Sequence, residues 1–233
     1  MSPGTLYVVA TPIGNLEDVT LRALRTLREV ALIACEDTRR TRILLARHEI
    51  ATPTISYFEH NKLARGPQLL RMLAEGRSIA LVTDAGTPGI SDPGFMLVRD
   101  ARAAGIVVVP IPGPSAVVTA LSAAGIPSDR FVFDGFLPVK PGRRVNRLKA
   151  LRELETTIVV YESPYRVIAA LEAIGEVFGE VDVVVARELT KQFEEIVIAT
   201  PSAHRARFAA TEPRGEFTLV IPRVRAGAAG ETD

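Results

Sequence analysis

The sequence has little of what several common functional sites require. It contains one cysteine, Cys35, three histidines and no tryptophan among 233 residues. A single cysteine excludes a disulfide within the chain, and one cysteine with three scattered histidines lacks the spacing of a metal site. We therefore expect chemistry that uses neither a metal nor a thiol, and we interpret Cys35 as a small buried strand residue.

Long apolar runs are also missing. The longest ones, at 106–111 and 157–160, fall far short of the roughly 20 residues that a membrane-spanning helix needs. The first apolar run has no basic region before it, which favours a first strand over a signal peptide. These features predict a soluble, cytoplasmic protein without a membrane partner.

Three familiar motifs are absent. No G-x-G-x-x-G follows the first apolar run, no P-loop occurs anywhere, and the segment 113–117 lacks the second glycine of a nucleophile elbow. The dinucleotide fingerprint, the P-loop nucleotide site and the hydrolase elbow are therefore excluded.

The composition is that of a globular chain with a neutral overall charge. With 47% hydrophobic and 24% charged residues it can bury a substantial core, and its net charge of +1 says little about partners. Arginine outnumbers lysine by 24 to 4. Clustered arginines favour bidentate contacts with phosphate, although codon composition explains such a bias equally well.

Short apolar runs that alternate with amphipathic stretches predict an α/β fold. In the first half, strands are predicted at 6–10, 30–35, 54–57, 78–82 and 106–110, and helices at 20–27, 67–73 and 96–104. Strands separated by helices imply a mostly parallel sheet with helices on both faces.

The Pro/Gly-rich stretch 112–115 separates the halves. After it we predict a helix at 115–124 and strands at 131–136, 157–161, 181–186, 195–199 and 216–222. The last three strands follow one another closely, so the C-terminal sheet is predicted to be mixed. We expect an N-terminal α/β domain over 1–112, a C-terminal α/β domain over 113–223 and a disordered tail over 224–233.

Three loops rich in glycine and proline follow predicted strands, at 11–15, 84–94 and 112–115. Ligands of open parallel sheets bind beyond the carboxyl ends of the strands, so we expect these loops to line one crevice. Glycine lets backbone approach a ligand, and proline holds a loop in place. Ordinary turn chemistry explains any one loop as well, but three together favour a binding site.

Eight ordered segments resemble the ribosomal RNA small subunit methyltransferase I family. They are TPIGNLEDVTLRAL from residue 11, ACEDTRRT at 34–41, LVTDAGTPGISDPG at 81–94, VPIPGPSA at 109–116, GIPSDRFVFDGFLP at 125–138, YESPYR at 161–166, ARELTK at 186–191 and RGEFTLVI at 214–221. The resemblance implies a tetrapyrrole-methylase-like fold, a homodimer and the cofactor S-adenosylmethionine. It also implies 2′-O-methylation of a cytidine in small-subunit (16S) ribosomal RNA, with the RNA or the small ribosomal subunit as partner.

By this resemblance, loop residues of both halves bind the cofactor, largely through backbone groups. They are Pro12, Gly14, Asp84, Ala85, Gly86, Thr87, Ile90, Ser115, Tyr161, Ala186, Leu189, Gly215, Glu216 and Phe217. Without the resemblance, Tyr161 is better interpreted as a core residue at a strand end.

Methyl transfer to a ribose hydroxyl requires alignment of the reacting atoms and removal of a proton. We hypothesise that Lys191, if desolvated, or one of the carboxylates Glu36, Asp37 and Glu188 assists the proton transfer. The alternative interpretation of the segment 36–39 is a helix N-terminus with a capping acid.

Two basic sets are candidates for RNA contact. On one face of a predicted helix lie Lys140, Arg143, Arg144 and Arg147, with Lys149 and Arg152 close by. The second set follows the second strand and contains Arg39, Arg40, Arg42 and Arg47, and we add His60 after the third strand. Phosphate contacts would make affinity fall with salt, whereas a merely solvated helix face would not. Aromatics make up only 6% of the chain, so no base-stacking platform is indicated.

Two other functions stay open. A tetrapyrrole C-methyltransferase would share the fold and the cofactor, and a non-catalytic RNA-binding module would keep the fold alone. Family members often continue past the last strand with a basic helical segment, whereas this chain ends soon after 220–223. We expect either that this segment is dispensable here, or that this is a shortened version whose affinity for RNA is altered.

Overall fold

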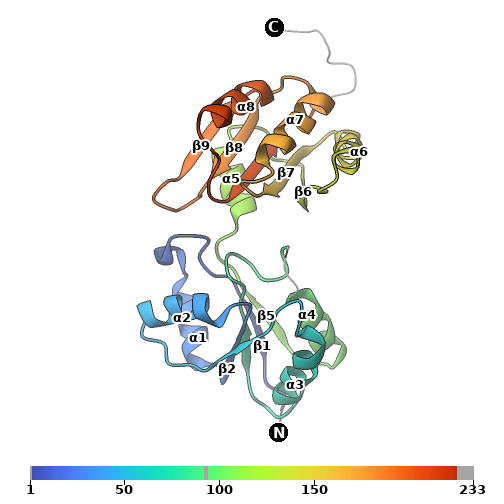
Figure 1. The fold of residues 1–233 in the computed structure, drawn as a ribbon. Coiled ribbons are helices and arrows are strands. Elements are labelled where there is room, and N and C mark those ends of the chain that lie inside the picture. The colour runs from blue at the N-terminus through green and yellow to red at the C-terminus, as the bar shows by residue number, and fades with distance from the viewer. Residues whose placement is uncertain (1, 92–93, 225–233) are drawn as a thin grey trace. The chain divides into compact units, whose positions relative to one another are not determined.

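The computed structural model describes residues 2–91 and 94–224. The chain divides into two compact units, Met1–Ser115 and Ala116–Asp233 (Figure 1). The boundary expected after residue 112 lies in the same loop as this division. Residues 225–233 of the predicted tail lie outside the described residues.

Unit 1 is built on a five-stranded sheet of the order β3-β2-β4-β1-β5. Its strands are β1 (Leu6–Val9), β2 (Leu32–Cys35), β3 (Thr54–Ser56), β4 (Ile79–Leu81) and β5 (Val108–Ile111). All four pairings between them are parallel, which confirms the prediction of a mostly parallel sheet. Helices cover both faces of such a sheet, which is why its strands are continuous apolar runs.

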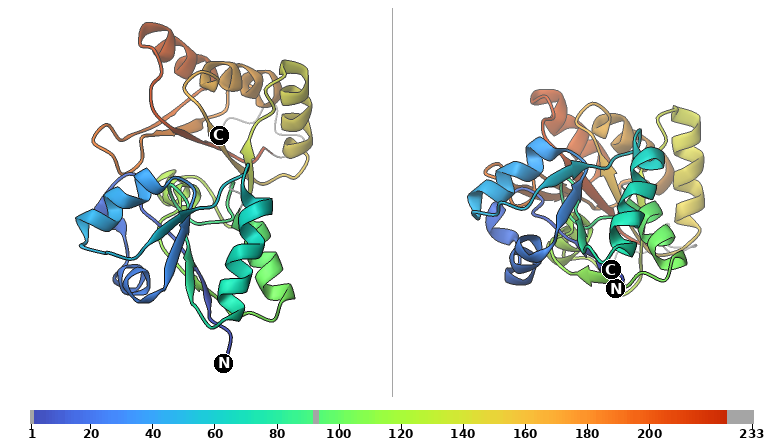
Figure 2. Two further views of the ribbon diagram at one scale, coloured as in Figure 1. Left: turned by 60° about the horizontal axis from the view of Figure 1, so that its bottom comes forward. Right: turned by 90° about the horizontal axis from the view of Figure 1, so that it is seen from below.

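The helices of unit 1 lie on both faces of its sheet (Figure 2). On one face lie α1 (Leu21–Glu29) and α2 (Thr38–Arg47), and on the other α3 (Lys62–Ala74) and α4 (Gly94–Ala103). A short 3₁₀ helix, η1 (Leu16–Asp18), precedes α1. The sequence predicted α1, α3 and α4 but not the full length of α2. Only three residues of α2 are buried, so its apolar stripe is narrow.

Unit 2 contains a second five-stranded sheet, of the order β6-β7-β10-β8-β9. Its strands are β6 (Phe131–Phe136), β7 (Thr157–Glu162), β8 (Val183–Arg187), β9 (Glu195–Ala199) and β10 (Phe217–Ile221). The β6–β7 pairing is parallel and the other three are antiparallel. The predicted mixed sheet is therefore confirmed.

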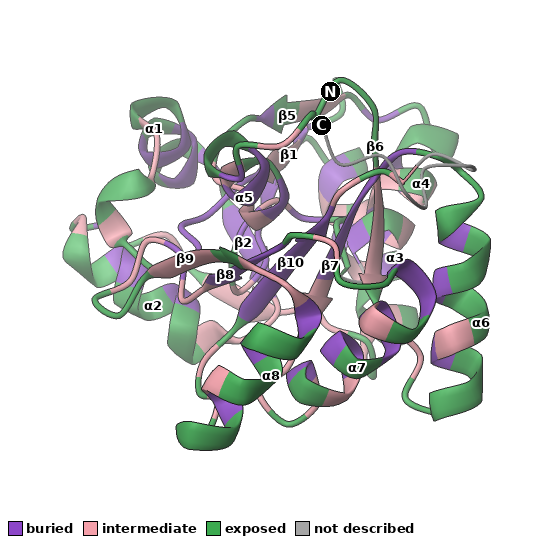
Figure 3. Ribbon diagram, turned by 90° about the horizontal axis from the view of Figure 1, so that it is seen from above, coloured by how far each residue is buried: buried purple, intermediate pink, exposed green. Residues whose placement is uncertain are grey.

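Three helices cover one face of this sheet and enclose the core of unit 2 (Figure 3). They are α6 (Pro141–Arg152), α7 (Val167–Phe178) and α8 (Pro201–Ala210). The helix α5 (Ala116–Ala123) contacts β10, and none of its buried residues belongs to that core, so it lies against the other face. Within the described residues, no helix is long and apolar enough to cross a membrane.

Candidate functional site

Hydrogen bonds join the three Gly/Pro loops of unit 1. Thr11 N donates to Gly86 O at 2.9 Å, and Gly86 N donates back to Thr11 O at 3.0 Å. Thr11 Oγ1 donates to Thr83 O at 3.0 Å, and Thr87 Oγ1 donates to Pro114 O at 3.2 Å. The loops therefore lie together beyond the carboxyl ends of β1, β4 and β5. We call residues 11–15, 84–91 and 112–115 the first loop cluster.

The path of this cluster depends on glycine. Gly86 and Gly89 have φ angles of +83° and +88°, in the left-handed region that favours glycine. A Cβ on Gly113 would lie 3.0 Å from Ala10 Cβ, tighter than an ordinary contact. The loop backbone is thus packed closely and lacks side-chain cover at Gly89, which is exposed, as is Ala85. Such a surface suits a ligand that is bound by backbone groups.

Asp84 connects the first loop cluster to the start of α2. Its Oδ1 accepts from Asp37 N at 2.9 Å, and its Oδ2 lies 3.6 Å from Arg40 Nε. Beside it, Thr83 Oγ1 donates to Glu36 Oε2 at 3.2 Å. The structure therefore brings the predicted residues Glu36, Asp37 and Arg40 next to the predicted cofactor loop.

Asp37 is the N-cap of α2. Its Oδ1 accepts from Arg39 N at 2.8 Å, and its Oδ2 lies 3.2 Å from Arg39 Nη2. These bonds from Arg39 hold the pKa of Asp37 below its ordinary value. The capping interpretation is confirmed, and a carboxyl with a lowered pKa is a weak proton acceptor.

A second set of predicted residues gathers in unit 2, after β8 and before β10. Lys191 Nζ donates to Glu188 Oε1 and to Glu216 Oε2, both at 2.8 Å. Glu188 Oε1 also accepts from Glu216 N at 2.9 Å, and Glu188 N donates to Glu216 O at 3.0 Å. We call residues 186–191 and 215–217 the second loop cluster.

The charges in this cluster stabilise one another. Burial disfavours the charged form of Lys191, but its bonds to Glu188 and Glu216 outweigh burial and raise its pKa. Burial also opposes ionisation of Glu188, yet Lys191 and the Glu216 amide lower the pKa of that carboxyl. Lys191 therefore stays protonated at neutral pH. Desolvation does not lower its pKa enough to make it a proton acceptor, because the two carboxylates outweigh burial.

The backbone of the second loop cluster is strained at two residues. Glu188 and Thr190 have φ angles of +50° and +67°, which L residues seldom adopt. The side chain of Glu188 occupies the space beside Gly215, where a Cβ would lie 2.5 Å from Glu188 Cγ and Cδ. Only glycine fits at position 215 with Glu188 in this conformation.

Tyr161 is the half-buried residue next to the end of β7, and its ring contacts two other aromatic rings. Its ring centroid lies 4.7 Å from that of Phe133 and 5.8 Å from that of Phe136. Burial raises the pKa of Tyr161, against a hydrogen bond from the Val117 amide in the first turn of α5. Tyr161 is thus half-buried with a bonded hydroxyl, as expected of a residue at a strand end. In unit 2, three other predicted cofactor residues are buried: Ala186, Leu189 and Phe217.

The basic face predicted on α6 is smaller than expected. Arg144 is only 6% exposed, and it donates from Nε to Pro138 O at 3.2 Å and from Nη2 to Val139 O at 2.9 Å. The prediction that Arg144 faces solvent is wrong, because its guanidinium binds two backbone carbonyls. Arg147 pairs with Asp134, with Nε 2.9 and 3.0 Å from the two carboxylate oxygens. Lys140 and Arg143 are exposed.

In unit 1, Arg39 has a side chain that is 87% exposed, and His60 is exposed in the turn before α3. The sequence reasoning did not select Thr83, Phe136, Glu162 or Arg166. Glu162 ends β7 and Arg166 lies in the turn before α7, so helical spacing gave no signal for their ion pair.

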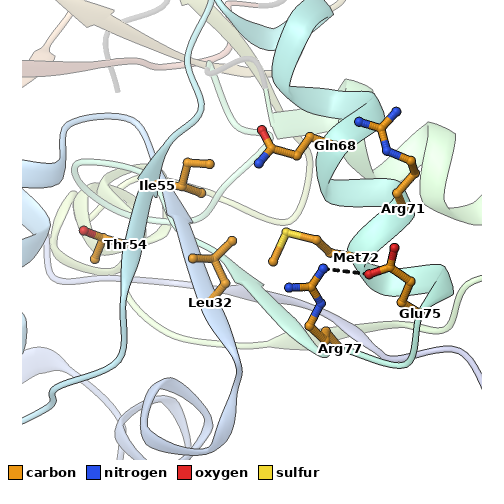
Figure 4. A pocket seen from close by; sticks show the side chains of 8 residues that line it. All are labelled: Leu32, Thr54, Ile55, Gln68, Arg71, Met72, Glu75 and Arg77. Carbon is orange, nitrogen blue, oxygen red and sulfur yellow. Dashed lines mark hydrogen bonds and ion pairs between the residues drawn. The ribbon is translucent and has the colours of Figure 1, made fainter.

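A pocket of about 380 Å³ lies elsewhere in unit 1 (Figure 4). Its lining includes Leu32 and Thr54, the first residues of β2 and β3, and an ion pair of 2.7 Å between Arg77 and Glu75. It therefore lies at the amino ends of these strands, whereas the first loop cluster lies beyond the carboxyl ends of the strands. None of its lining residues belongs to the predicted site.

Sequence comparison matches residues 5–203 to the family of tetrapyrrole (corrin/porphyrin) methylases. A protein of Pseudomonas aeruginosa named ribosomal RNA small subunit methyltransferase I is 54% identical over 95% of this chain and 79% of its own length. A protein of the same name from Thermotoga maritima is 45% identical over 94% of this chain and 98% of its own length.

Solved structures of low sequence identity share the fold. A cobalt precorrin-4 methyltransferase superposes with a TM-score of 0.69 at 18% identity, over 93% of this chain and 94% of that one. The uroporphyrin-III-C-methyltransferase of Thermus thermophilus gives a TM-score of 0.65 at 21% identity, with the same two coverages. At such identities the likeness concerns the fold alone.

Proposed function

Because this chain belongs to the ribosomal RNA small subunit methyltransferase I family of the tetrapyrrole methylases, we propose that it methylates the ribose 2′-hydroxyl of a cytidine in small-subunit (16S) ribosomal RNA. The observation that carries the proposal is the 54% identity to a relative with that name over 95% of the chain. The solved tetrapyrrole enzymes share only 18% and 21% of their residues with it. RNA is therefore favoured over a tetrapyrrole as the acceptor.

Methyltransferases of this family use S-adenosylmethionine, and the first loop cluster fits such a ligand. Ala85 and Gly89 are exposed and leave loop backbone accessible, and Ile90 is 46% exposed beside them. Backbone dipoles suit a sulfonium cation, and apolar side chains suit the adenine ring. We assign the cofactor to the predicted residues of this cluster (Pro12, Gly14, Asp84, Ala85, Gly86, Thr87, Ile90 and Ser115).

The cofactor supplies a methyl group on a sulfonium sulfur, which leaves as a neutral thioether. The protein has to align the attacking oxygen and accept the hydroxyl proton as the new carbon–oxygen bond forms. Lys191 is a poor acceptor because its pKa is raised, and Asp37 and Glu188 are weak ones because their pKa values are lowered.

Glu36 is the carboxylate that best suits this task. Its carboxylate accepts a hydrogen bond from the Thr83 hydroxyl, and within the described residues no lysine or arginine forms an ion pair with it. It lies beside Asp84 of the first loop cluster through its neighbours Thr83 and Asp37. We assign the proton to a Glu36 carboxylate oxygen, and we assign Lys191 to holding Glu188 and Glu216 in place.

The variant Glu36→Gln tests this assignment. Glutamine keeps the size of the side chain and an acceptor for Thr83, but it cannot take up the proton. We expect the single-turnover rate of methyl transfer to fall by about 10²- to 10⁴-fold, with cofactor affinity unchanged.

Asp37→Asn is the matched control, because asparagine caps a helix as well as aspartate does. It should keep both the stability and the rate of the wild type. A Glu36→Gln enzyme that transfers methyl at the wild-type rate would remove Glu36 from the mechanism.

For the RNA we propose contacts with Arg39, Arg40 and His60 of unit 1 and with Lys140 and Arg143 of unit 2. These side chains carry exposed donors for phosphate.

We also propose that the enzyme is a homodimer and acts in the cytoplasm. Sedimentation velocity should give twice the chain mass, and a monomeric mass would contradict this part of the proposal.

A further inference from the structure

An irregularity in β6 sets the direction of one aromatic side chain. In the pairing of β6 with β7, Phe133 is opposite Val159 and Phe136 is opposite Tyr161. The chain thus advances three residues on β6 and two on β7, which is the mark of a β-bulge. The φ angle of Gly135 in the bulge is +66°.

The bulge moves Phe136 to the other face of the sheet. Side chains alternate along a strand, so in a regular β6 Phe136 would share a face with Val132 and Asp134. That face is the one toward α6, where Asp134 pairs with Arg147 and Val132 packs on the core. The extra residue instead places Phe136 with Phe133 and Tyr161, and leaves it 53% exposed.

The ring of Phe136 is held by its neighbours. Tyr161 meets it edge-on, with centroids 5.8 Å apart and ring planes at 64°. The guanidinium of Arg166 lies over it, 5.7 Å from the ring centroid. Both neighbours come from the YESPYR segment, in which the family resemblance implied a role for Tyr161 alone.

Arg166 is itself fixed in position. Its Nη2 lies 2.6 Å from Glu162 Oε1, and its Nη1 donates to Leu137 O at 3.4 Å. Glu162 is 2% exposed, and its Oε2 has no hydrogen-bond partner among the described residues. A buried carboxylate thus orients a cation against a half-exposed aromatic ring.

We infer that Phe133, Phe136, Tyr161 and Arg166 form a stacking shelf that binds an unpaired base of the RNA substrate, with the base against Phe136. The inference rests on the proposed function and adds the kind of RNA that unit 2 recognises. Single-stranded bases are bound by stacking on aromatic rings and guanidinium planes, whereas duplex RNA hides its base faces. The low aromatic content argued against such a platform, but the bulge gathers three of the few aromatic rings at one place.

The test compares three variants at one position. Phe136→Ala removes the ring, Phe136→Leu keeps apolar bulk without a ring, and Phe136→Trp keeps a stacking surface. Affinity is measured by fluorescence anisotropy for a single-stranded RNA oligonucleotide and for the duplex of the same sequence, at several salt concentrations.

Phe136→Ala and Phe136→Leu should weaken single-strand binding by about 5- to 150-fold, while Phe136→Trp restores it. The slope of affinity against salt should not change, because stacking releases no counterions. Duplex binding, cofactor affinity and the molecular mass in solution should stay as in the wild type.

Equal single-strand binding by the wild type and Phe136→Ala would overturn the shelf, as would an equal loss for the duplex. A changed molecular mass would overturn it too, since Phe136 would then belong to a subunit interface. Methyl transfer by the wild type to ribosomal RNA is recorded separately. If it occurs while Phe136→Ala binds single strands normally, the proposed function stands and the shelf fails.

Discussion

Position 215 tolerates only glycine in the surroundings that the structure shows. Its φ angle is +89°, and any Cβ there would overlap the side chain of Glu188. Glu188 in turn holds Lys191 and the Glu216 amide. A small change at position 215 should therefore break the second loop cluster.

We predict that Gly215→Ala lowers the free energy of unfolding by about 1–3 kcal/mol, through backbone strain and loss of the Glu188 bonds. Chemical denaturation measures this. Gly142→Ala in α6 is the control, since a Cβ there meets nothing within 4 Å. It should be neutral or stabilise by up to about 1 kcal/mol. Equal effects of the two substitutions would show that the overlap with Glu188 is relieved at no cost.

Other residues show what sequence patterns can and cannot give. Cys35 is buried at the end of β2 as predicted, because an apolar run places it there. Arg144 was assigned to an exposed basic face, and helical periodicity indeed puts it near Lys140 and Arg147. Periodicity does not reveal that the preceding Pro138 and Val139 carbonyls lie within its reach.

The helix α8 is attached to β8 by a buried histidine. His204 is fully buried, and its Nε2 donates to Val183 O at 2.9 Å, while Nδ1 has no partner among the described residues. Burial lowers the pKa of His204 below 6.5, more than the bond to Val183 raises it. A proton on Nδ1 would be buried without an acceptor, so the folded protein keeps this ring neutral.

Stability should therefore fall in mild acid. The unfolded chain takes up a proton on His204 below about pH 6.5, whereas the folded one resists, so protons favour unfolding there. In the variant His204→Gln, glutamine can still donate to Val183 but takes up no proton in the unfolded chain. Between about pH 7.5 and pH 5.5, this variant should therefore lose less stability than the wild type in urea denaturation. His60→Gln, at an exposed histidine, should follow the wild type. Parallel curves for all three proteins would contradict this account.

Among the elements, all ten strands of the described residues were predicted, because each is a compact run of apolar residues. The helices were harder. In α7 nearly every residue is apolar, so no amphipathic stripe marks it, and α8 buries only three residues. The bulge in β6 was not predicted, since an extra residue in one strand becomes visible only when its partner strand is known.

The two compact units each have a core of their own, and each contains some of the residues that the family resemblance implied for the cofactor. In unit 1 the sequence indicated that three loops meet, because all follow parallel strands of one sheet. In unit 2 the corresponding residues were assigned by family resemblance alone. Their bonding became visible in the structure, since Lys191 and Glu216 lie 25 residues apart in the chain.

The most direct test is transfer of labelled methyl from S-adenosylmethionine to small ribosomal subunits that lack their native methylations, followed by mapping of the labelled nucleotide. We predict label on the ribose 2′-oxygen of a cytidine in the small-subunit RNA. Label on a base, or no label from a protein that binds the cofactor, would contradict ribose methylation and direct attention to another acceptor such as a tetrapyrrole.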